Sequence, residues 1–109
     1  MTTGIINSPI VELIRDTARQ VMPADSRVVL FGSQARGDAG TDSDWDLLLL
    51  LNKKNSWKSA FDDYAFPFVE LGWANDKEIN PIVYTFDEWA NRRNTPFYQN
   101  VERDGINIQ

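Results

Sequence analysis

Two short polar segments hold the residues whose types and spacing could do chemistry. The first is Gly32-Ser33, where a glycine lets the backbone approach a bulky ligand and a serine offers a hydroxyl. If a helical turn begins there, its exposed N–H groups form an anion site. The second is Ser43-Asp44-Trp45-Asp46, whose two aspartates point to the same side at a strand start. Together the segments predict a place where one or two magnesium ions bridge a triphosphate.

Each segment alone has an ordinary structural explanation. Gly-Ser is common in loops, and Ser-Asp-x-Asp is a common turn and capping sequence. The specificity comes from their combination, because they follow one another between two apolar runs.

The composition restricts the chemistry that the chain can carry out. The chain has no cysteine and no histidine, which excludes disulfides, thiol nucleophiles, histidine-based triads and zinc sites. Acid–base or metal chemistry must therefore use carboxylates, hydroxyls and amines, which favours hard cations such as Mg²⁺. Eleven Lys and Arg against sixteen Asp and Glu give a net charge of −5, which argues against direct nucleic-acid binding.

The length of 109 residues predicts a single domain, residues 1–109, with one modest core. The longest apolar run, Leu47 to Leu51, is far shorter than the roughly 20 residues of a membrane span. No secretory signal peptide is visible at the N-terminus. We therefore expect a cytoplasmic protein that does not bind membranes.

The segments around the two polar motifs predict strands. Arg27 to Phe31 (RVVLF) predicts a buried strand that ends at Gly32. Asp46 to Leu51 (DLLLLL) could be a buried helix segment or a strand, and its length and flanking turn residues favour a strand. Ile79 to Thr85 predicts a third strand, in which Pro81 indicates an edge position or a strand end. Ser33 to Ser43 predicts a loop with room for one short helical turn.

Helices are predicted before and after these strands. Ser8 can cap a first helix that begins with Pro9 and stops at Pro23. Its inner face is predicted at Ile10, Leu13, Ile14, Ala18 and Val21. A second helix is indicated by the aromatic and apolar stripe Trp57, Phe61, Tyr64, Phe68 and Leu71. This stripe could be a base-stacking platform, but core packing is the favoured interpretation.

Proline and glycine positions complete the expected order of elements. Pro67 should kink or split the second helix. Asp87 to Arg93 predicts a short helix with Asp87 or Thr85 near its cap, and Thr95-Pro96 opens a last helix that runs to about Arg103. The expected fold class is α/β (α+β), a small mixed sheet of three or four strands with helices packed against it.

The string Gly32-Ser33-x-Ala35-Arg36-Gly37, followed by Ser43-Asp44-x-Asp46-Leu47, resembles the signature of the DNA polymerase β-like nucleotidyltransferase superfamily. Within that superfamily, the resemblance is close to the single-domain minimal nucleotidyltransferases. The resemblance is specific over residues 28–51 and implies a palm-like nucleotidyltransferase fold. It also implies an activity, the magnesium-dependent transfer of a nucleoside monophosphate from a triphosphate to a hydroxyl, with ATP as the expected substrate.

The resemblance also implies roles for individual residues. Gly32 and Ser33 would hold the β- and γ-phosphates, and Arg36 would lie near the phosphates or the mouth of the site. Asp44 and Asp46 would be catalytic and would ligate two Mg²⁺ ions.

The chain departs from the family pattern on its third predicted strand. Related proteins usually carry a third carboxylate there, which helps to deprotonate the attacking hydroxyl, whereas the corresponding position here is Asn80. An amide cannot act as a general base. Glu78 shares the face of Asn80 if the strand is regular, so it could be the catalytic carboxylate or an ordinary surface residue.

Two functions of different classes follow from these observations. The first is an enzyme that transfers AMP to a hydroxyl on a partner protein, since the chain has no room for a second acceptor-binding domain. By resemblance, that partner would be a separate helical protein of the HEPN type, paired with this chain as toxin and antitoxin. The second is a nucleotide-binding antitoxin-like module that is catalytically weak and acts by contact. Asn80 and exposed aromatics would suit it, with candidates at Trp73, Trp89, Phe97 and Tyr98. A homo-oligomer is compatible with either function.

Overall fold

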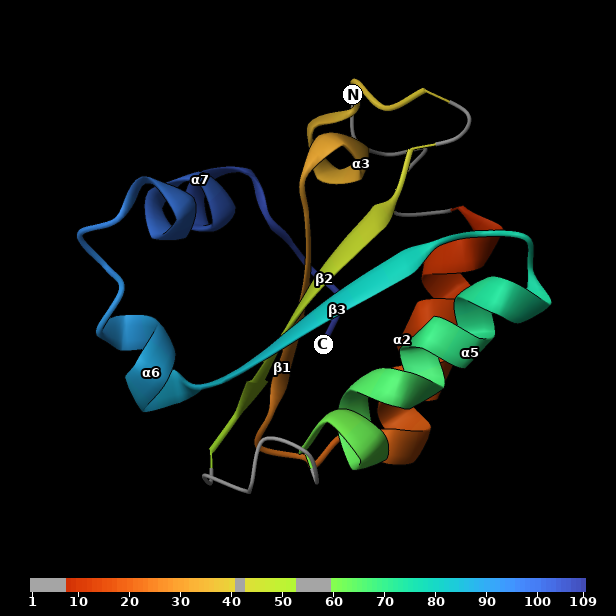
Figure 1. Ribbon diagram of the computed structural model, residues 1–109, viewed down its shortest axis with the longest axis horizontal. Helices are drawn as coiled ribbons and strands as arrows, with labels where there is room; N and C mark the ends of the chain where they lie inside the picture. Colours follow the sequence, from red (N-terminus) through yellow and green to blue (C-terminus); the bar gives the residue numbers. More distant parts are fainter. Residues whose placement is uncertain (1–7, 41–42, 53–59) are drawn as a thin grey trace.

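A four-stranded mixed sheet forms the centre of the protein (Figure 1). The structure is a computed structural model that describes residues 8–40, 43–52 and 60–109. The strand order is β3-β2-β1-β4. β1 (Arg27–Phe31) pairs antiparallel with β2 (Trp45–Leu51) and with β4 (Ile106–Asn107), whereas β3 (Ile79–Thr85) pairs parallel with β2. This mixed α/β architecture confirms the fold class expected from the sequence.

Helices cover both faces of the sheet. Their bounds are α2 Pro9–Val21, α3 Ser33–Arg36, the π-helical turn η1 Phe61–Ala65, α5 Phe66–Ala74, α6 Phe86–Ala90 and α7 Pro96–Asp104. Figure 1 shows α2 and α5 on one side of the sheet, α6 and α7 on the other, and α3 at one end of β1. Within the described ranges, no helix is long and apolar enough to cross a membrane.

The leucine run of β2 is buried on both faces, which explains why five consecutive apolar residues form a strand. Leu47, Leu49 and Leu51 pack into the core under α2 and α5. Leu48 and Leu50 pack on the opposite face with Trp89 of α6 and Val101 of α7. Because side chains alternate along a strand, Asp46 lies on the same face as Leu48 and Leu50. The α6/α7 face therefore carries the candidate carboxylate.

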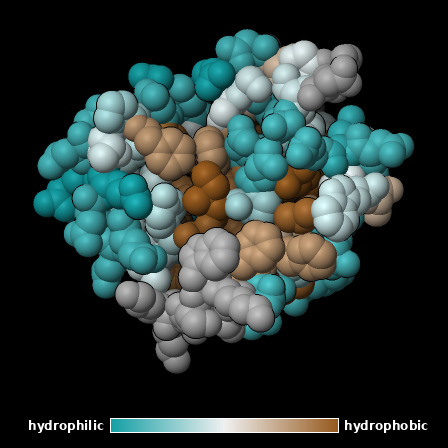
Figure 2. Space-filling model, in the orientation of Figure 1, coloured by the Kyte–Doolittle hydropathy of each residue, from teal (hydrophilic) through white to brown (hydrophobic). Residues whose placement is uncertain are grey.

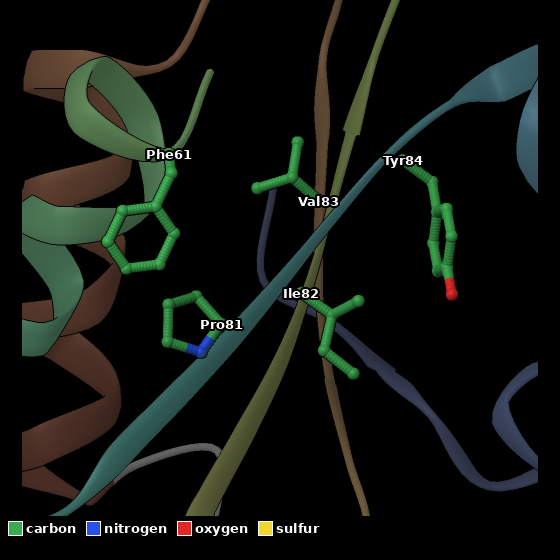
Figure 3. Close-up of a pocket in the computed structure, with 5 residues that line it drawn as sticks. All are labelled: Phe61, Pro81, Ile82, Val83 and Tyr84. Carbon is green, nitrogen blue, oxygen red and sulfur yellow. The ribbon is translucent and has the colours of Figure 1, made fainter. Parts of the chain in front are cut away.

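β3 is the edge strand that Pro81 predicted. Figure 3 shows the alternation of its side chains, with Pro81 and Val83 on the side of Phe61, and Ile82 and Tyr84 on the other side. A pocket of about 210 Å³ lies along this edge and is lined by those five residues. Figure 2, in the orientation of Figure 1, shows hydrophobic surface at the centre of the face that the reader sees. Among the described residues of the lining, the Tyr84 hydroxyl is the polar side-chain group.

The helix predictions were correct in their positions and wrong in some details. α2 has the predicted bounds, but Leu13 is exposed and Val11 takes its place in the core, because the buried face is centred on Val11, Ile14 and Ala18. Ser8 occupies the N-cap position without a side-chain hydrogen bond to the helix. The predicted split at Pro67 is wrong, because the backbone stays helical from η1 through Pro67 into α5 and only the turn before α5 is π-helical.

Near the C-terminus, α6 ends at Ala90 rather than Arg93, and Thr85 rather than Asp87 is its cap. The Thr85 hydroxyl accepts from the Glu88 N–H at 3.0 Å, and the Glu88 carboxylate accepts from the Thr85 N–H at 2.8 Å. α7 begins after Thr95 as predicted, whereas the two-residue strand β4 was missed.

The aromatic residues divide between core and surface. Of the predicted stripe, Phe68 is fully buried and Phe61, Tyr64 and Leu71 are packed against the core, which confirms core packing. Trp57 lies outside the described residues. Trp89 is only 4% exposed, whereas Trp73 is 66% exposed.

Candidate functional site

The backbone of Gly32 lies against the carboxylate of Asp46. Phe31 pairs with Asp46 across β1 and β2, so the chain leaves β1 beside this side chain. Gly32 has φ +79° and ψ −158°, a conformation that is essentially restricted to glycine. A Cβ at this position would lie 2.5 Å from Asp46 Oδ2. Glycine is therefore required here both for its backbone conformation and for the space it leaves to the carboxylate.

The short helix α3 begins directly after Gly32 with Ser33. Gly37 ends it in the left-handed conformation, and its N–H donates to the Ser33 carbonyl at 3.0 Å. The Asp38 N–H donates to the same carbonyl at 3.2 Å. The structure thus contains the short helical turn that the sequence allowed, with Ser33 as its first residue.

The buried side chain of Gln34 connects this turn to the segment before Asp44. Gln34 Nε2 donates to the Ser43 carbonyl at 3.1 Å, and it is the buried polar side chain of the described core. The Ser43 hydroxyl in turn accepts from the Gly40 N–H at 2.9 Å. Sequence reasoning missed Gln34, whose only signal is a polar residue on a helical turn beside the buried Ala35. Gln34 is therefore a positioning residue for the first aspartate.

Asp44 and Asp46 are brought together with Asn80. Asp46 is in register with Asn80 across β2 and β3, and Asn80 Nδ2 donates to Asp44 Oδ2 at 3.0 Å. Burial and the negative charge of Asp44 raise the pKa of the Asp46 carboxyl, while the hydrogen bond from Asn80 and the charge of Arg36 partly offset this. The two carboxylates thus repel one another, and a cation between them would relieve that repulsion.

The donor set fits a hard divalent cation. Both aspartates offer oxygen ligands, and Mg²⁺ commonly binds through one or two carboxylates while substrate phosphates and water complete its shell. The described residues contain no group of three or more carboxylates placed to hold a metal ion. Substrate oxygens would therefore have to supply the remaining ligands.

The other two predicted site residues, Arg36 and Glu78, are exposed. Arg36 is exposed, and its Nε donates to Asp38 Oδ2 at 3.2 Å. Glu78 is exposed and directly precedes β3, and its carbonyl accepts from the Trp45 N–H at 2.8 Å. The structure thus places the Asn80 amide, and not the Glu78 carboxylate, in contact with Asp44.

A second pocket, also of about 210 Å³, opens beside Gly32. Its lining consists of Phe31, Gly32, Arg36, Phe97, Asn100, Val101 and Asp104. The last four come from α7 at the spacing of one helix face. Sequence reasoning did not assign this face to the site, because nothing local indicates that α7 packs beside the end of β1.

Comparison with known families and structures identifies the family and the fold of the chain. Residues 11–102 match the nucleotidyltransferase domain family. The solved structure of a toxin–antitoxin with AMP-PNP is 19% identical, with a TM-score of 0.64, and the match covers 91% of this chain and 72% of that chain. A mutant of the toxin–antitoxin MntA-HpeT is 17% identical, with the same TM-score and coverage.

A candidate nucleotidyltransferase from Sulfolobus solfataricus is 22% identical, with a TM-score of 0.53, and the match covers 90% of this chain and 78% of that chain. No curated protein matches the sequence. At these identities the likeness to the solved structures concerns the fold, which is the nucleotidyltransferase fold that the two motifs predicted.

The contact at Gly32 predicts unequal effects of alanine at the two left-handed glycines. Gly32→Ala should destabilise the protein by about 3 kcal/mol, because the backbone is strained and the Asp46 carboxylate must move. Gly37→Ala is the matched control and should cost only about 1 kcal/mol, since its φ is also positive but its Cβ would meet no atom within 4 Å. Urea unfolding measures both values. Equal losses would contradict the close approach of Gly32 to Asp46.

The raised pKa of Asp46 predicts that Asp46→Asn stabilises the metal-free protein at neutral pH. The ionised carboxylate costs the folded state free energy once the pH exceeds its ordinary pKa of 3.8, and an amide avoids that cost. Thermal unfolding in the presence of a chelator should show a higher Tm for the variant at pH 7. The advantage should shrink as the pH falls through the raised pKa and vanish well below 3.8, where the carboxyl is protonated in both states. A lower Tm at pH 7 would refute the argument.

Proposed function

This chain belongs to the nucleotidyltransferase domain family, and on that premise we propose that it transfers AMP from ATP to a hydroxyl group of a partner protein. One observation carries the proposal. The Gly32 backbone lies against Asp46, so the turn that begins with Ser33 lies beside the two aspartates, where β1 ends and β2 begins. Phosphates held at the turn would lie beside the carboxylates.

In this reaction the hydroxyl oxygen attacks the α-phosphorus of ATP. A new phosphorus–oxygen bond forms, the bond from the α-phosphorus to the bridging oxygen breaks, and pyrophosphate leaves. Gly32 and Ser33 would hold the β- and γ-phosphates. Asp44 and Asp46 would hold Mg²⁺, two ions by family resemblance, which when bound supply charge neutralisation at the phosphates and activation of the attacking oxygen.

The proton of the attacking hydroxyl needs an acceptor. Asn80 cannot serve, because an amide has no basic lone pair at neutral pH. Glu78 directly precedes β3 and lies two residues before Asn80 in the sequence. Its side chain is exposed, so it has room to turn towards an acceptor that docks there. We assign Glu78 this role as a proposal, since hydrogen bonds of general bases often form only in the complex with substrate.

The acceptor would be presented by a separate protein. The two neighbours with a TM-score of 0.64 are toxin–antitoxin structures, one of them with AMP-PNP. These neighbours support a pairing of this chain with a partner protein. The antitoxin role and the helical HEPN-type toxin are proposed from the sequence resemblance.

The alternative is a nucleotide-binding antitoxin-like module that acts by contact. The observation in its favour is Asn80, which contacts Asp44 where the family pattern has a third carboxylate. Both functions include ATP binding, so only covalent transfer of AMP distinguishes them.

Asp44→Asn should weaken the binding of MgATP by about tenfold or more, because it removes one ligand and one negative charge from the cation site. The variant should remain folded, since an asparagine oxygen can still accept from Asn80. Calorimetric titration measures the affinity. Asp87→Asn, which makes the same change in charge on the exposed start of α6, is the control and should bind like the wild type. Wild-type affinity in Asp44→Asn would remove that residue from the metal site.

Glu78→Gln should lower the rate of AMP transfer by about 100-fold or more and leave the affinity for ATP unchanged, because it removes only the proton acceptor. Asn80→Asp should raise the rate, because it adds a carboxylate beside Asp44. Transfer of label from α-labelled ATP to lysate proteins measures both rates. If neither change alters the rate and the wild type labels no protein, the enzyme function is wrong and the contact module replaces it.

A further inference from the structure

The pocket between α7 and the end of β1 adjoins the proposed phosphate turn but has no role in the transfer described above. It shares Gly32 and Arg36 with that turn. A ligand whose phosphates lie at Ser33 could therefore extend into the pocket without crossing the sheet. Its volume of about 210 Å³ is below the 300–1,000 Å³ of sites for drug-sized ligands, so it suits one ring system and not a whole nucleotide.

One wall of the pocket is aromatic and fixed in place. The Phe31 and Phe97 rings meet edge-to-face with centroids 5.5 Å apart, and Phe97 meets the buried Trp89 in the same way at 5.6 Å. Phe97 is thus held between the strand and α6. A preformed aromatic wall of this kind favours flat, apolar-faced ligands, because no ordering of the protein is needed when the ligand binds.

The same face of α7 also carries hydrogen-bonding groups. Asn100 Oδ1 accepts from Arg103 Nη2 at 3.2 Å, which leaves the amide N–H₂ as a donor. Asp104 accepts two hydrogen bonds from Arg103, each 3.0 Å long. These bonds and the charges of Arg103 and Arg36 lower the pKa of Asp104, so its carboxylate stays an acceptor at neutral pH. A carboxylate has capacity for further hydrogen bonds. The pocket thus offers a donor and an acceptor beside an aromatic wall.

We infer that this pocket binds the nucleobase of the nucleoside triphosphate. The inference rests on the proposed function, because it takes the phosphates to lie at Gly32 and Ser33. A base brings a flat ring for Phe97 and an edge with both donors and acceptors for Asn100 and Asp104. Arg36 lines the pocket and belongs to α3, so its guanidinium can stack on the base or pair with a phosphate. α7 thereby becomes a specificity element of the site.

The test fills the pocket and compares two ligands. Asn100 is exposed on α7, so Asn100→Trp can place an indole over the pocket with the fold retained, as thermal unfolding will verify. Gln99→Trp adds the same side chain at the exposed neighbouring position, which does not line the pocket, and is the matched control. Calorimetry with MgATP and with magnesium tripolyphosphate measures the contribution of the nucleoside.

We expect Asn100→Trp to weaken ATP binding about tenfold or more and to leave tripolyphosphate binding unchanged, whereas Gln99→Trp should bind both ligands like the wild type. Equal ATP affinities in the two variants would overturn the inference, and so would an equal loss of both ligands in Asn100→Trp. Wild-type protein that binds ATP no more tightly than tripolyphosphate would overturn it as well. Because the readout is binding, the absence of AMP transfer would count against the proposed function alone.

Discussion

The approach of the Gly32 backbone to the Asp46 carboxylate is the contact on which the rest of the site depends. It requires a residue without a Cβ, in a conformation that other residues rarely adopt. It also requires β1 and β2 to be fixed in the register that pairs Phe31 with Asp46. That register is stabilised by apolar side chains buried on both faces of the two strands. The core thus supplies the rigidity that holds a strained turn against a half-buried carboxylate.

The charges of the two aspartates give the neutral amide of Asn80 a structural advantage. Two carboxylates that share a partly buried position repel one another, and Asn80 donates a hydrogen bond without adding charge. A third carboxylate in place of Asn80 would increase that repulsion in the absence of a cation. The neutral amide therefore favours a folded state that is stable before any cation binds the aspartates. In the proposed transfer the same amide would leave the site without a proton acceptor at this position, so stability and the proposed catalysis make opposite demands there.

The sequence predicted the elements and motifs that are encoded locally. β1 was predicted to the residue because RVVLF is bounded by Gly32, and the family was identified because the two motifs lie within one short stretch. The features that the sequence did not predict depend on contacts between segments that are distant in the chain. The two residues of β4 form a strand only because Val29 and Leu30 lie beside them, and Gln34 matters only because Ser43 folds back onto it. The α7 pocket likewise depends on packing between segments distant in the chain.

The position of β1 between β2 and β4 has a consequence for the order in which the protein assembles. β1 and β2 are joined by a loop of about a dozen residues, so closing this pair costs little chain entropy. β4 arrives only after all the other elements, and until then one long side of the apolar β1 has no hydrogen-bond partner. A newly synthesised chain would thus bring Gly32 and Asp46 together early and carry an open, aggregation-prone strand until residues 106–109 are available. Its dependence on chaperones should be greatest in that interval.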